Sequence, residues 1–233
     1  PFIKEEFPNF AEQIGFEEAA DKLGFLNFDG YGPPPSIFDS LLTAQRYERD
    51  GFNLVPSKTV PDLDDLCGRT FTFRQLIHCG ETWTRTQLPN LPKEPETYNA
   101  LVELARNIID PVVDYFGMIE PTYGFCSAAL AKNIPGRIAP AIDQHAGHER
   151  KRGGTHVCSR LGAAIDFLVA DEDMEGVANW IIANLPFDRL YFYGRDRPIH
   201  VSYGPEQSRV AYRMEVTKGG ARMPRPYSKT YPS

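Results

Sequence analysis

An acidic residue inside an apolar, strand-like run is the position of this chain that most needs a chemical explanation. Asp166 lies within residues 161–169, most of whose other side chains are apolar. Removing an ionised carboxylate from water costs several kcal/mol unless a cation and hydrogen bonds compensate. We therefore expect a metal ion to be the partner of Asp166.

A histidine in a second short apolar run is the first candidate for a further ligand. His200 lies within residues 198–203, and a segment of helical character separates this run from residues 161–169. A strand, a helix and a second strand can bring two strand-borne side chains together. A buried structural Asp–His pair is the alternative interpretation of the same two residues.

Composition and charge restrict the class of protein. A chain of 233 residues can form one main domain with a smaller appendage. The hydrophobic fraction of 42% and the charged fraction of 24% are those of a globular protein. No stretch approaches the roughly 18 apolar residues that a membrane span needs. The net charge of −6 argues against a surface that is basic throughout, but it allows a local basic patch for nucleic acid.

The cysteines do not form a pattern that is typical of a disulfide scaffold or of a structural zinc site. The four of them are widely spaced and include no C-x-x-C pair, at Cys67, Cys79, Cys126 and Cys158. The sequence begins at Pro1, and nothing in it resembles a secretory signal. These features predict reduced thiols in a cytoplasmic protein.

Residues 1–66 differ in composition from the rest of the chain, and they are predicted to be a helical appendage with a linker. Spacing of apolar residues predicts a helix over residues 10–23, and Ser36 is placed to cap a second helix that ends before Gly51. Residues 53–65 are polar and interrupted by proline, which is typical of an extended connector.

The remainder predicts an α+β fold in which helices pack on a small antiparallel sheet. Apolar residues at helical spacing predict a core helix over residues 95–117, which Pro111 should bend or split. A second helix is expected over residues 173–185. Strands are expected at residues 121–125, 189–193, 199–203 and 210–216, and a poorly ordered basic tail at residues 218–233.

Several short motifs occur in an order that points to a known family. They are FTFRQL at 71–76, IDPV at 109–112, TYGFCS at 122–127, DQH at 143–145, GAAIDF at 162–167, FDRL at 187–190 and IHVSY at 199–203. In this order they resemble the M15 family of zinc D-Ala-D-Ala carboxypeptidases and related peptidoglycan peptidases. The resemblance covers residues 70 to about 206 and implies a hedgehog/DD-peptidase-like fold for a domain at residues 67–217.

The resemblance implies a zinc site and a hydrolytic reaction. The residues that match the family's ligands are His145, Asp166 and His200. Three protein ligands and an open position are the arrangement of a catalytic zinc ion, whose bound water has a pKa near 7. The expected protein is a zinc-dependent hydrolase of a peptide or amide bond, with a peptide or peptidoglycan-like substrate.

The chain departs from the family in the spacing of its first ligand. The stretch between His145 and Asp166 is much longer than usual, and the family spacing would place Ser159 in the ligand position. Either His145 reaches across an inserted loop or His156 takes its place. His148 and Cys158 are further alternatives, whereas His78 is expected to be a satisfied core residue.

The family's catalytic residues also differ. Its arginine-bearing element reads Phe-Cys-Ser at 125–127, which leaves Cys126 at a catalytic-site position, although a free cysteine is more often a small buried hydrophobe. Tyr193 stands in the commonest register of the general base, and Asp196 is the nearest carboxylate. Asp196 lies between Arg195 and Arg197, a setting that also fits a solvated turn.

A basic run within the inserted loop supports a second function hypothesis. Arg150, Lys151 and Arg152 are consecutive, and such a run is usually only a solvated loop. Alternatively, it presents cations to nucleic acid or another anionic ligand. In this second hypothesis the M15-like domain has lost or changed its chemistry and serves in binding. Neither hypothesis involves a membrane, and the sequence leaves the oligomeric state open.

Overall fold

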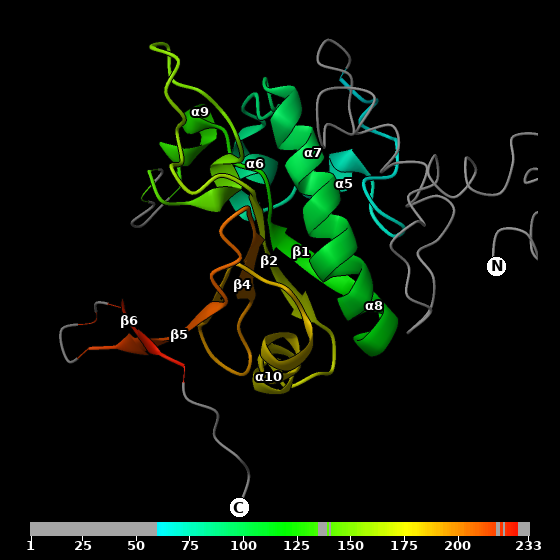
Figure 1. The fold of residues 1–233 in the computed structure, drawn as a ribbon, viewed down its shortest axis with the longest axis vertical. Helices are drawn as coiled ribbons and strands as arrows, with labels where there is room; N and C mark the ends of the chain where they lie inside the picture. Colours follow the sequence, from blue (N-terminus) through cyan, green and yellow to red (C-terminus); the bar gives the residue numbers. More distant parts are fainter. Residues whose placement is uncertain (1–59, 135–138, 140, 218–219, 221, 228–233) are drawn as a thin grey trace, which may run out of the picture. The chain divides into compact units, whose positions relative to one another are not determined.

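The structure is a computed structural model that describes residues 60–134, 139, 141–217, 220 and 222–227 (Figure 1). The helices predicted at residues 10–23 and after Ser36, and most of the predicted connector at 53–65, lie outside the described residues. None of the described helices is long and apolar enough to cross a membrane.

A six-stranded sheet organises the described residues, and its strand order is β1-β2-β4-β3-β5-β6. The strands are β1 Ile119–Tyr123, β2 Ala163–Val169, β3 Arg189–Phe192, β4 Ile199–Tyr203, β5 Val210–Val216 and β6 Arg222–Pro226. The α+β class is confirmed, and the sheet is mostly antiparallel as predicted, except that β3 and β5 pair in parallel. After β4 the chain reverses direction and crosses over β3, and β5 pairs with the other edge of β3. Because β4 and β3 are antiparallel, this reversal makes β5 run in the same direction as β3.

Strand β6 lies in the segment that was predicted to be a poorly ordered tail. Residues Arg222–Pro226 pair antiparallel with β5 and form one edge of the sheet. Pro224 and Pro226 cannot donate to a ladder, and an edge strand is where a sheet tolerates such residues. The pairing with β5 adds a sixth strand to the sheet, which the Pro-rich composition of residues 222–226 did not predict.

The helix predicted over residues 95–117 is divided into three parts. It consists of α7 Pro95–Leu104, a π-helical turn η1 at Ala105–Ile109, and α8 Asp110–Phe116. Pro111 is the second residue of α8 and follows directly after the π-helical turn. The backbone stays helical through Pro111, so the regular α-helix is interrupted by a π-helical turn and is not ended there.

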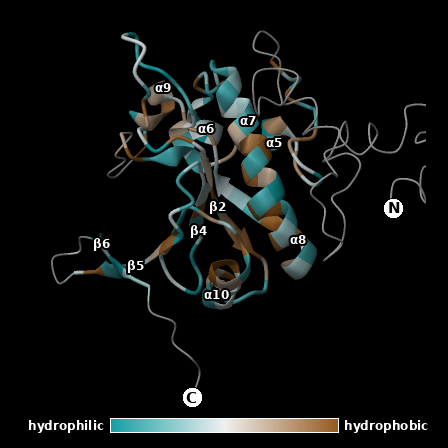
Figure 2. Ribbon diagram, viewed as in Figure 1, coloured by the Kyte–Doolittle hydropathy of each residue, from teal (hydrophilic) through white to brown (hydrophobic). Residues whose placement is uncertain are grey.

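Helices cover one face of the sheet. Helix α7 contacts β2 and β4, and α10 Met174–Asn184 contacts β2 and β3. Figure 2 shows α7 with hydrophobic and hydrophilic stretches side by side, as expected of a helix with one buried face. The core side chains from the strands include Ile165, Phe167, Leu190, Ile199 and Val201, all at most 1% exposed.

Alternation along the strands sends the polar side chains to the opposite face. Asp166 lies between Ile165 and Phe167, and His200 between Ile199 and Val201, so both point away from the helices. The register of the sheet pairs Asp166 with His200, and His200 with Tyr191. One row of residues across neighbouring strands therefore carries both candidate ligands.

Four short elements complete the described fold. They are α5 Phe73–Ile77, α6 Glu81–Thr86, α9 Ala128–Ala131 and the 3-10 turn η2 at Gln144–Ala146. Helix α5 begins with a capping box formed by Thr72 and Gln75. Ser127 caps α9 and Asp143 caps η2 through their side-chain oxygens.

Candidate metal centre

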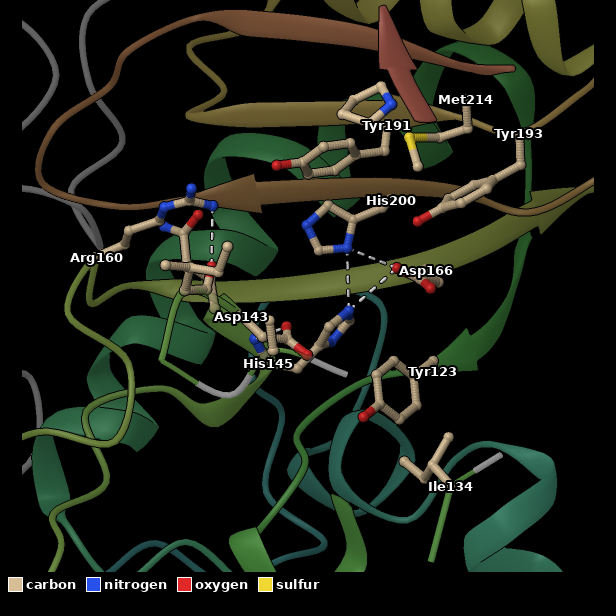
Figure 3. A pocket seen from close by; sticks show the side chains of 14 residues that line it. Tyr123, Ile134, Asp143, His145, Arg160, Asp166, Tyr191, Tyr193, His200 and Met214 are labelled. Atoms are coloured by element: carbon tan, nitrogen blue, oxygen red, sulfur yellow. Dashed lines mark hydrogen bonds and ion pairs between the residues drawn. The ribbon is translucent and has the colours of Figure 1, made fainter. Parts of the chain in front are cut away.

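Three side chains from three separate elements meet on the face of the sheet opposite α7 and α10. His145 comes from η2, Asp166 from β2 and His200 from β4 (Figure 3). His145 Nε2 lies 3.1 Å from Asp166 Oδ1, His200 Nδ1 lies 2.8 Å from the same oxygen, and the two nitrogens are 3.1 Å apart. The predicted trio is therefore a compact group that could hold a metal ion.

The triangle of ligand atoms has the size that a transition metal requires. An ion about 2.0–2.1 Å from each ligand separates its ligands by about 2.9 Å in an octahedral arrangement and about 3.4 Å in a tetrahedral one. The observed edges of 2.8 to 3.1 Å lie close to this range. Little movement of the side chains would be needed for an ion to bind to all three.

The other ring nitrogen of His145 shows how the ligand is oriented. Nδ1 lies 2.8 Å from the carbonyl oxygen of Gly124 and donates its hydrogen there. In the neutral ring, Nε2 then carries a lone pair that faces Asp166 Oδ1, which is also an acceptor. Two acceptors that face each other call for a cation between them, and a backbone carbonyl behind the histidine is a usual outer partner of a metal ligand.

The pKa values of the group follow from the same crowding of acceptors. Burial opposes ionisation of Asp166, but His145 and His200 outweigh it and hold the pKa of this carboxyl well below its usual range. Burial opposes the charging of His145, yet Asp143 and Asp166 raise the pKa of its ring. Both directions mean that the centre favours a positive charge, which a proton or a metal ion can provide.

The centre opens into a pocket of about 520 Å³. Figure 3 shows its lining residues, which are Tyr123, Ile134, Ala139, Ile142, Asp143, Gln144, His145, Arg160, Asp166, Tyr191, Tyr193, His200, Met214 and Pro224. The Asp166 side chain is 24% exposed, whereas those of His145 and His200 are 3% and 10% exposed. The ligands are thus held by the protein on one side and face the pocket on the other.

Tyr193, which stands in the commonest register of the general base, lines this pocket. Burial raises the pKa of its phenol well above the usual range, and Asp166 and Tyr191 add to the effect. The guanidinium of Arg222 on β6 lies 5.5 Å from the centre of the ring and opposes the shift. Tyr193 therefore stays protonated at neutral pH and can act as a hydrogen-bond donor rather than as a base.

The two other predicted catalytic residues are placed outside the pocket lining. Asp196 lies in the exposed turn between β3 and β4. Cys126 is 4% exposed, and its backbone N–H donates to the carbonyl oxygen of His145 at 2.8 Å. Burial raises the pKa of the Cys126 thiol to about 11, so the thiol is neutral. Cys126 thus helps to position His145, and the geometry gives Asp196 no contact with the metal group.

The inserted loop does not supply the first ligand. His148 Nε2 accepts a hydrogen bond from the backbone of Gly162 at 3.1 Å, and His156 Nδ1 lies 3.0 Å from the carbonyl oxygen of His148. Ser159 Oγ donates to the carbonyl oxygen of Ala141. His145 is therefore the histidine that meets Asp166, and the alternatives His148, His156 and Cys158 are not part of the described metal group.

His78 also differs in detail from its prediction. It is half-buried rather than a core residue, and its ring stacks on Trp83 with 4.3 Å between ring centres. Burial is the main cause that lowers the pKa of its imidazole.

Two charged residues of the described pocket lining, Asp143 and Arg160, were not predicted from the sequence. Asp143 caps η2, and its Oδ1 accepts the N–H of His145 at 3.1 Å. The sequence signal for Asp143 is its place in the DQH motif at 143–145. Arg160 comes from the end of the inserted loop, and its place in the pocket depends on the path of that loop, which no local pattern predicts.

A second buried polar cluster holds the turn that carries His145. Gln144 Nε2 donates to Asp188 Oδ2 at 2.7 Å and to the carbonyl oxygen of Leu161 at 2.8 Å. Ser202 Oγ donates to Gln144 Oε1 at 2.8 Å. A Cβ atom on Gly204 would come within 2.6 Å of Gln144 Nε2, so glycine is needed at this close approach. The network fixes the residue next to His145 from both sides.

The start of the inserted loop is attached to α7. Glu149 Oε1 accepts the backbone N–H groups of Lys93 and Glu94, at 2.9 and 3.2 Å, and the hydroxyl of Thr97 at 3.0 Å. An acidic group at the N-terminus of a helix binds its free N–H groups and interacts favourably with the helix dipole. Glu149 therefore anchors the chain soon after His145.

Comparison with known proteins adds no assignment to this geometry. No family profile, no curated protein and no solved structure matches the chain.

Proposed function

We propose that the chain is a zinc-dependent hydrolase of a peptide or amide bond, similar to the M15 carboxypeptidases. The observation that carries the proposal is the convergence of His145, Asp166 and His200 at one wall of a pocket. Three ligands of this kind on one side leave room for water and substrate on the other, which is the arrangement of catalytic rather than structural zinc.

The surrounding residues support hydrolytic chemistry. A bound zinc ion supplies Lewis acidity, which polarises a carbonyl group and lowers the pKa of a water molecule toward 7. Tyr193, protonated at neutral pH, can donate a hydrogen bond to the oxygen that gains negative charge. Asp143 lines the same pocket and can accept a proton and later return it to the leaving amine. In this proposal Asp143 takes the role that the sequence had suggested for Asp196.

The order of the ligands along the chain agrees with the M15 resemblance. The first histidine precedes the aspartate, and the second histidine follows on a strand beside it. The cation of the family's arginine-bearing element has no counterpart at Cys126, which is buried and neutral. We therefore propose the family's reaction type and leave its natural substrate to experiment.

Metal content in purified protein tests the proposal directly. We expect wild type, dialysed against trace zinc, to hold about one ion per chain by mass spectrometry, and Asp166→Ala to hold almost none. Asp196→Ala is the matched control, because it removes a nearby exposed carboxylate and should keep the ion. A full complement of metal in Asp166→Ala, or none in wild type, would contradict the proposal.

Activity is the second part of the test. A peptide that ends in D-Ala-D-Ala is the probe that the resemblance suggests, and its hydrolysis should stop with a chelator and return with zinc. Asp143→Asn should lower kcat by about 10²-fold or more, as expected for loss of a proton-transferring group. Equal activity of Asp143→Asn and wild type would remove Asp143 from the mechanism.

The basic run of the inserted loop supports a second candidate function, the binding of nucleic acid by a domain with altered chemistry. Arg150, Lys151 and Arg152 are all exposed, at a turn closed by the bridge between Arg150 and His156. Fluorescence anisotropy with labelled DNA and RNA should then show binding that weakens with salt and with replacement of all three by glutamine. Arg225→Gln is the control for a general loss of charge, and no binding at low salt would exclude this candidate.

A further inference from the structure

The hairpin formed by β5 and β6 supplies one wall of the metal pocket. Met214 of β5 and Pro224 of β6 both line the pocket, and they pair with each other across the hairpin. Figure 3 shows Met214 and Tyr193 at the same end of the pocket. The hairpin lies beyond residue 206, where the M15 resemblance ends, so the resemblance gives it no role.

The face of the hairpin that lines the pocket continues beyond it. Side chains alternate between the two faces of a strand, so Val216 lies on the same face as Met214. Val216 pairs with Arg222, which places Arg222 on this face as well. At a rise of about 3.3 Å per residue, this pair lies roughly 7 Å beyond Met214 and Pro224, the length of about two residues of an extended peptide. Val216 is 66% exposed, so a ligand can reach this part of the face.

Arg222 brings a cation to the edge of the pocket. The central carbon of its guanidinium lies 5.5 Å from the centre of the Tyr193 ring, and Tyr193 lines the pocket. Arg222 is exposed, and among the described residues no carboxylate lies within ion-pair distance of it. By contrast, Arg225 on the opposite face of the hairpin is paired with Glu215. The hairpin therefore presents a cation without a described acidic partner on the face that adjoins the pocket.

The outer edge of β6 is poorly suited to bind a ligand by strand pairing. Tyr227 donates its backbone N–H to the carbonyl oxygen of Ala211 at 2.9 Å, so the odd-numbered residues of β6 direct their N–H groups toward β5. The even-numbered residues then face outward, and two of them are Pro224 and Pro226, which have no N–H to donate. A ligand chain is therefore expected to lie across the face of the hairpin rather than along its edge.

We propose that this face of the hairpin binds a part of the substrate that lies away from the reacting bond, and that Arg222 pairs there with an acidic side chain of an extended peptide. The inference rests on the proposed function and adds a class of substrate, a peptide with an acid at least about two residues from that bond. Met214 and Val216 provide apolar surface for the intervening residues. The guanidinium of Arg222 forms charge-assisted hydrogen bonds with the carboxylate.

Peptide thiols test this without knowledge of the natural substrate. The protein is loaded with Co²⁺, whose visible absorption changes when a thiolate binds to it. Each probe is an amidated alanine peptide with a thiol at one end and a single glutamate two, three or four residues away, and its matched partner has glutamine instead. Placing the thiol at the N-terminus in one set and at the C-terminus in another covers both directions of the chain.

The expected result is a preference for glutamate that depends on its position. In one of the two sets, wild type should bind the best glutamate probe about fivefold more tightly than its glutamine partner at low salt, as for an exposed ion pair. The preference should shrink at a salt concentration of about 0.5 M, because the pair is screened.

Variants assign the preference to Arg222. Arg222→Gln should bring the affinities of the two matched probes within about 1.5-fold of each other, and Arg222→Lys should keep most of the preference. Arg225→Gln is the matched control, because it removes a cation from the opposite face of the same strand and should keep the wild-type preference. Equal stoichiometry of bound Co²⁺ and equal melting temperatures would show that the variants are folded.

The outcomes separate this inference from the proposed function. If wild type prefers no glutamate probe, or Arg222→Gln keeps the preference, or Arg225→Gln loses it equally, the role of Arg222 is wrong and the metal site stands. If 2-mercaptoethanol binds to the Co²⁺ and no peptide thiol does, the hairpin excludes an extended chain and the inference is also wrong. If no Co²⁺ binds, or bound Co²⁺ takes up no thiol at all, the inference and the proposed function both fail.

Discussion

Two aspartates of the fold, the buried Asp188 and the half-buried Asp166, have opposite sets of hydrogen-bond partners. Asp188 is 0% exposed, and both its oxygens are fully supplied with donors. Ser208 donates to Oδ1 from its N–H and its hydroxyl, at 3.0 and 2.6 Å, and Gln144 and Arg189 donate to Oδ2 at 2.7 and 2.9 Å. Asp188 therefore needs no further partner.

Asp166 has fewer hydrogen-bond donors around its carboxylate than Asp188. Its Oδ1 faces two imidazole nitrogens that are themselves 3.1 Å apart, and one of them, in the neutral ring of His145, has no hydrogen to donate. The side chain is also open to the pocket. Both aspartates occupy motifs that the sequence singled out, so the difference teaches that burial alone does not mark a functional acid. A shortage of donors together with access to a pocket does.

The largest effect should come from removing the charge of Asp166. Asp166→Asn should weaken zinc binding by roughly a thousandfold, because loss of a ligand costs more than the 10–100-fold of an outer partner. Zinc at a hundredfold excess over its Kd should raise the stability of wild type by about 2.7 kcal/mol and leave Asp166→Asn unchanged. Thermal unfolding with and without zinc measures this, and equal stabilisation of both proteins would contradict a role of Asp166 as a ligand.

The matched change at Asp188 should act on folding instead. Asp188→Asn places a donor where Gln144 and Arg189 also donate, and we expect it to lower the free energy of unfolding by about 3 kcal/mol. Urea unfolding in the presence of a chelator measures this cost, and Asp166→Asn should cost less under the same conditions. At saturating zinc, Asp188→Asn should still bind one ion; its loss would show that the two clusters are not separate in function.

The acid dependence of that cost provides a smaller effect. Hydrogen bonds from Ser208 and Gln144 and the charge of Arg189 outweigh burial and lower the pKa of Asp188 below its usual value of 3.8. The charged carboxylate therefore stabilises the fold fully above about pH 3.8, and this contribution is lost as the pH falls toward the folded-state pKa. The difference in stability between wild type and Asp188→Asn should be constant near pH 6 and shrink below pH 3.8. A difference that grows with acid would reverse the assigned direction.

The smallest effect should come from the histidine of the inserted loop. His156 contacts His148 and not the metal group, so His156→Ala should change zinc affinity by no more than about twofold. His145→Ala is the comparison and should lose most of the affinity. Competition with a coloured zinc chelator measures the zinc affinity of both variants. Similar losses of affinity in the two variants would show that His156 is a metal ligand.

The sequence predicted the parts of the site that depend on local pattern. The apolar, strand-like runs around Asp166 and His200 predicted that both residues lie on strands, and the structure pairs them directly. Strands β4 and β5 have the predicted bounds, and helix α10 lies within its predicted range. The chemistry of Pro111 predicted a disturbance of the long helix, and a π-helical turn lies directly before this residue.

The remaining parts depend on contacts between distant segments. The parallel pairing of β3 with β5 is set by the path after β4, and β6 is stabilised by a neighbour rather than by its own composition. Arg160 and Asp143 reach the pocket because both ends of the inserted loop are fixed to the rest of the fold. Such placements have no periodic signal in the sequence.

The way the inserted loop is closed suggests a use in protein engineering. The backbones of Glu149 and Val157 are joined by a hydrogen bond, and Lys151 and Gly154 form a tight turn at the tip. Lengthening a loop whose ends are already fixed costs only about 0.6 kcal/mol for each doubling of its length. A peptide tag or a small reporter domain placed between Gly153 and Gly154 should therefore leave the distance between His145 and Asp166 unchanged.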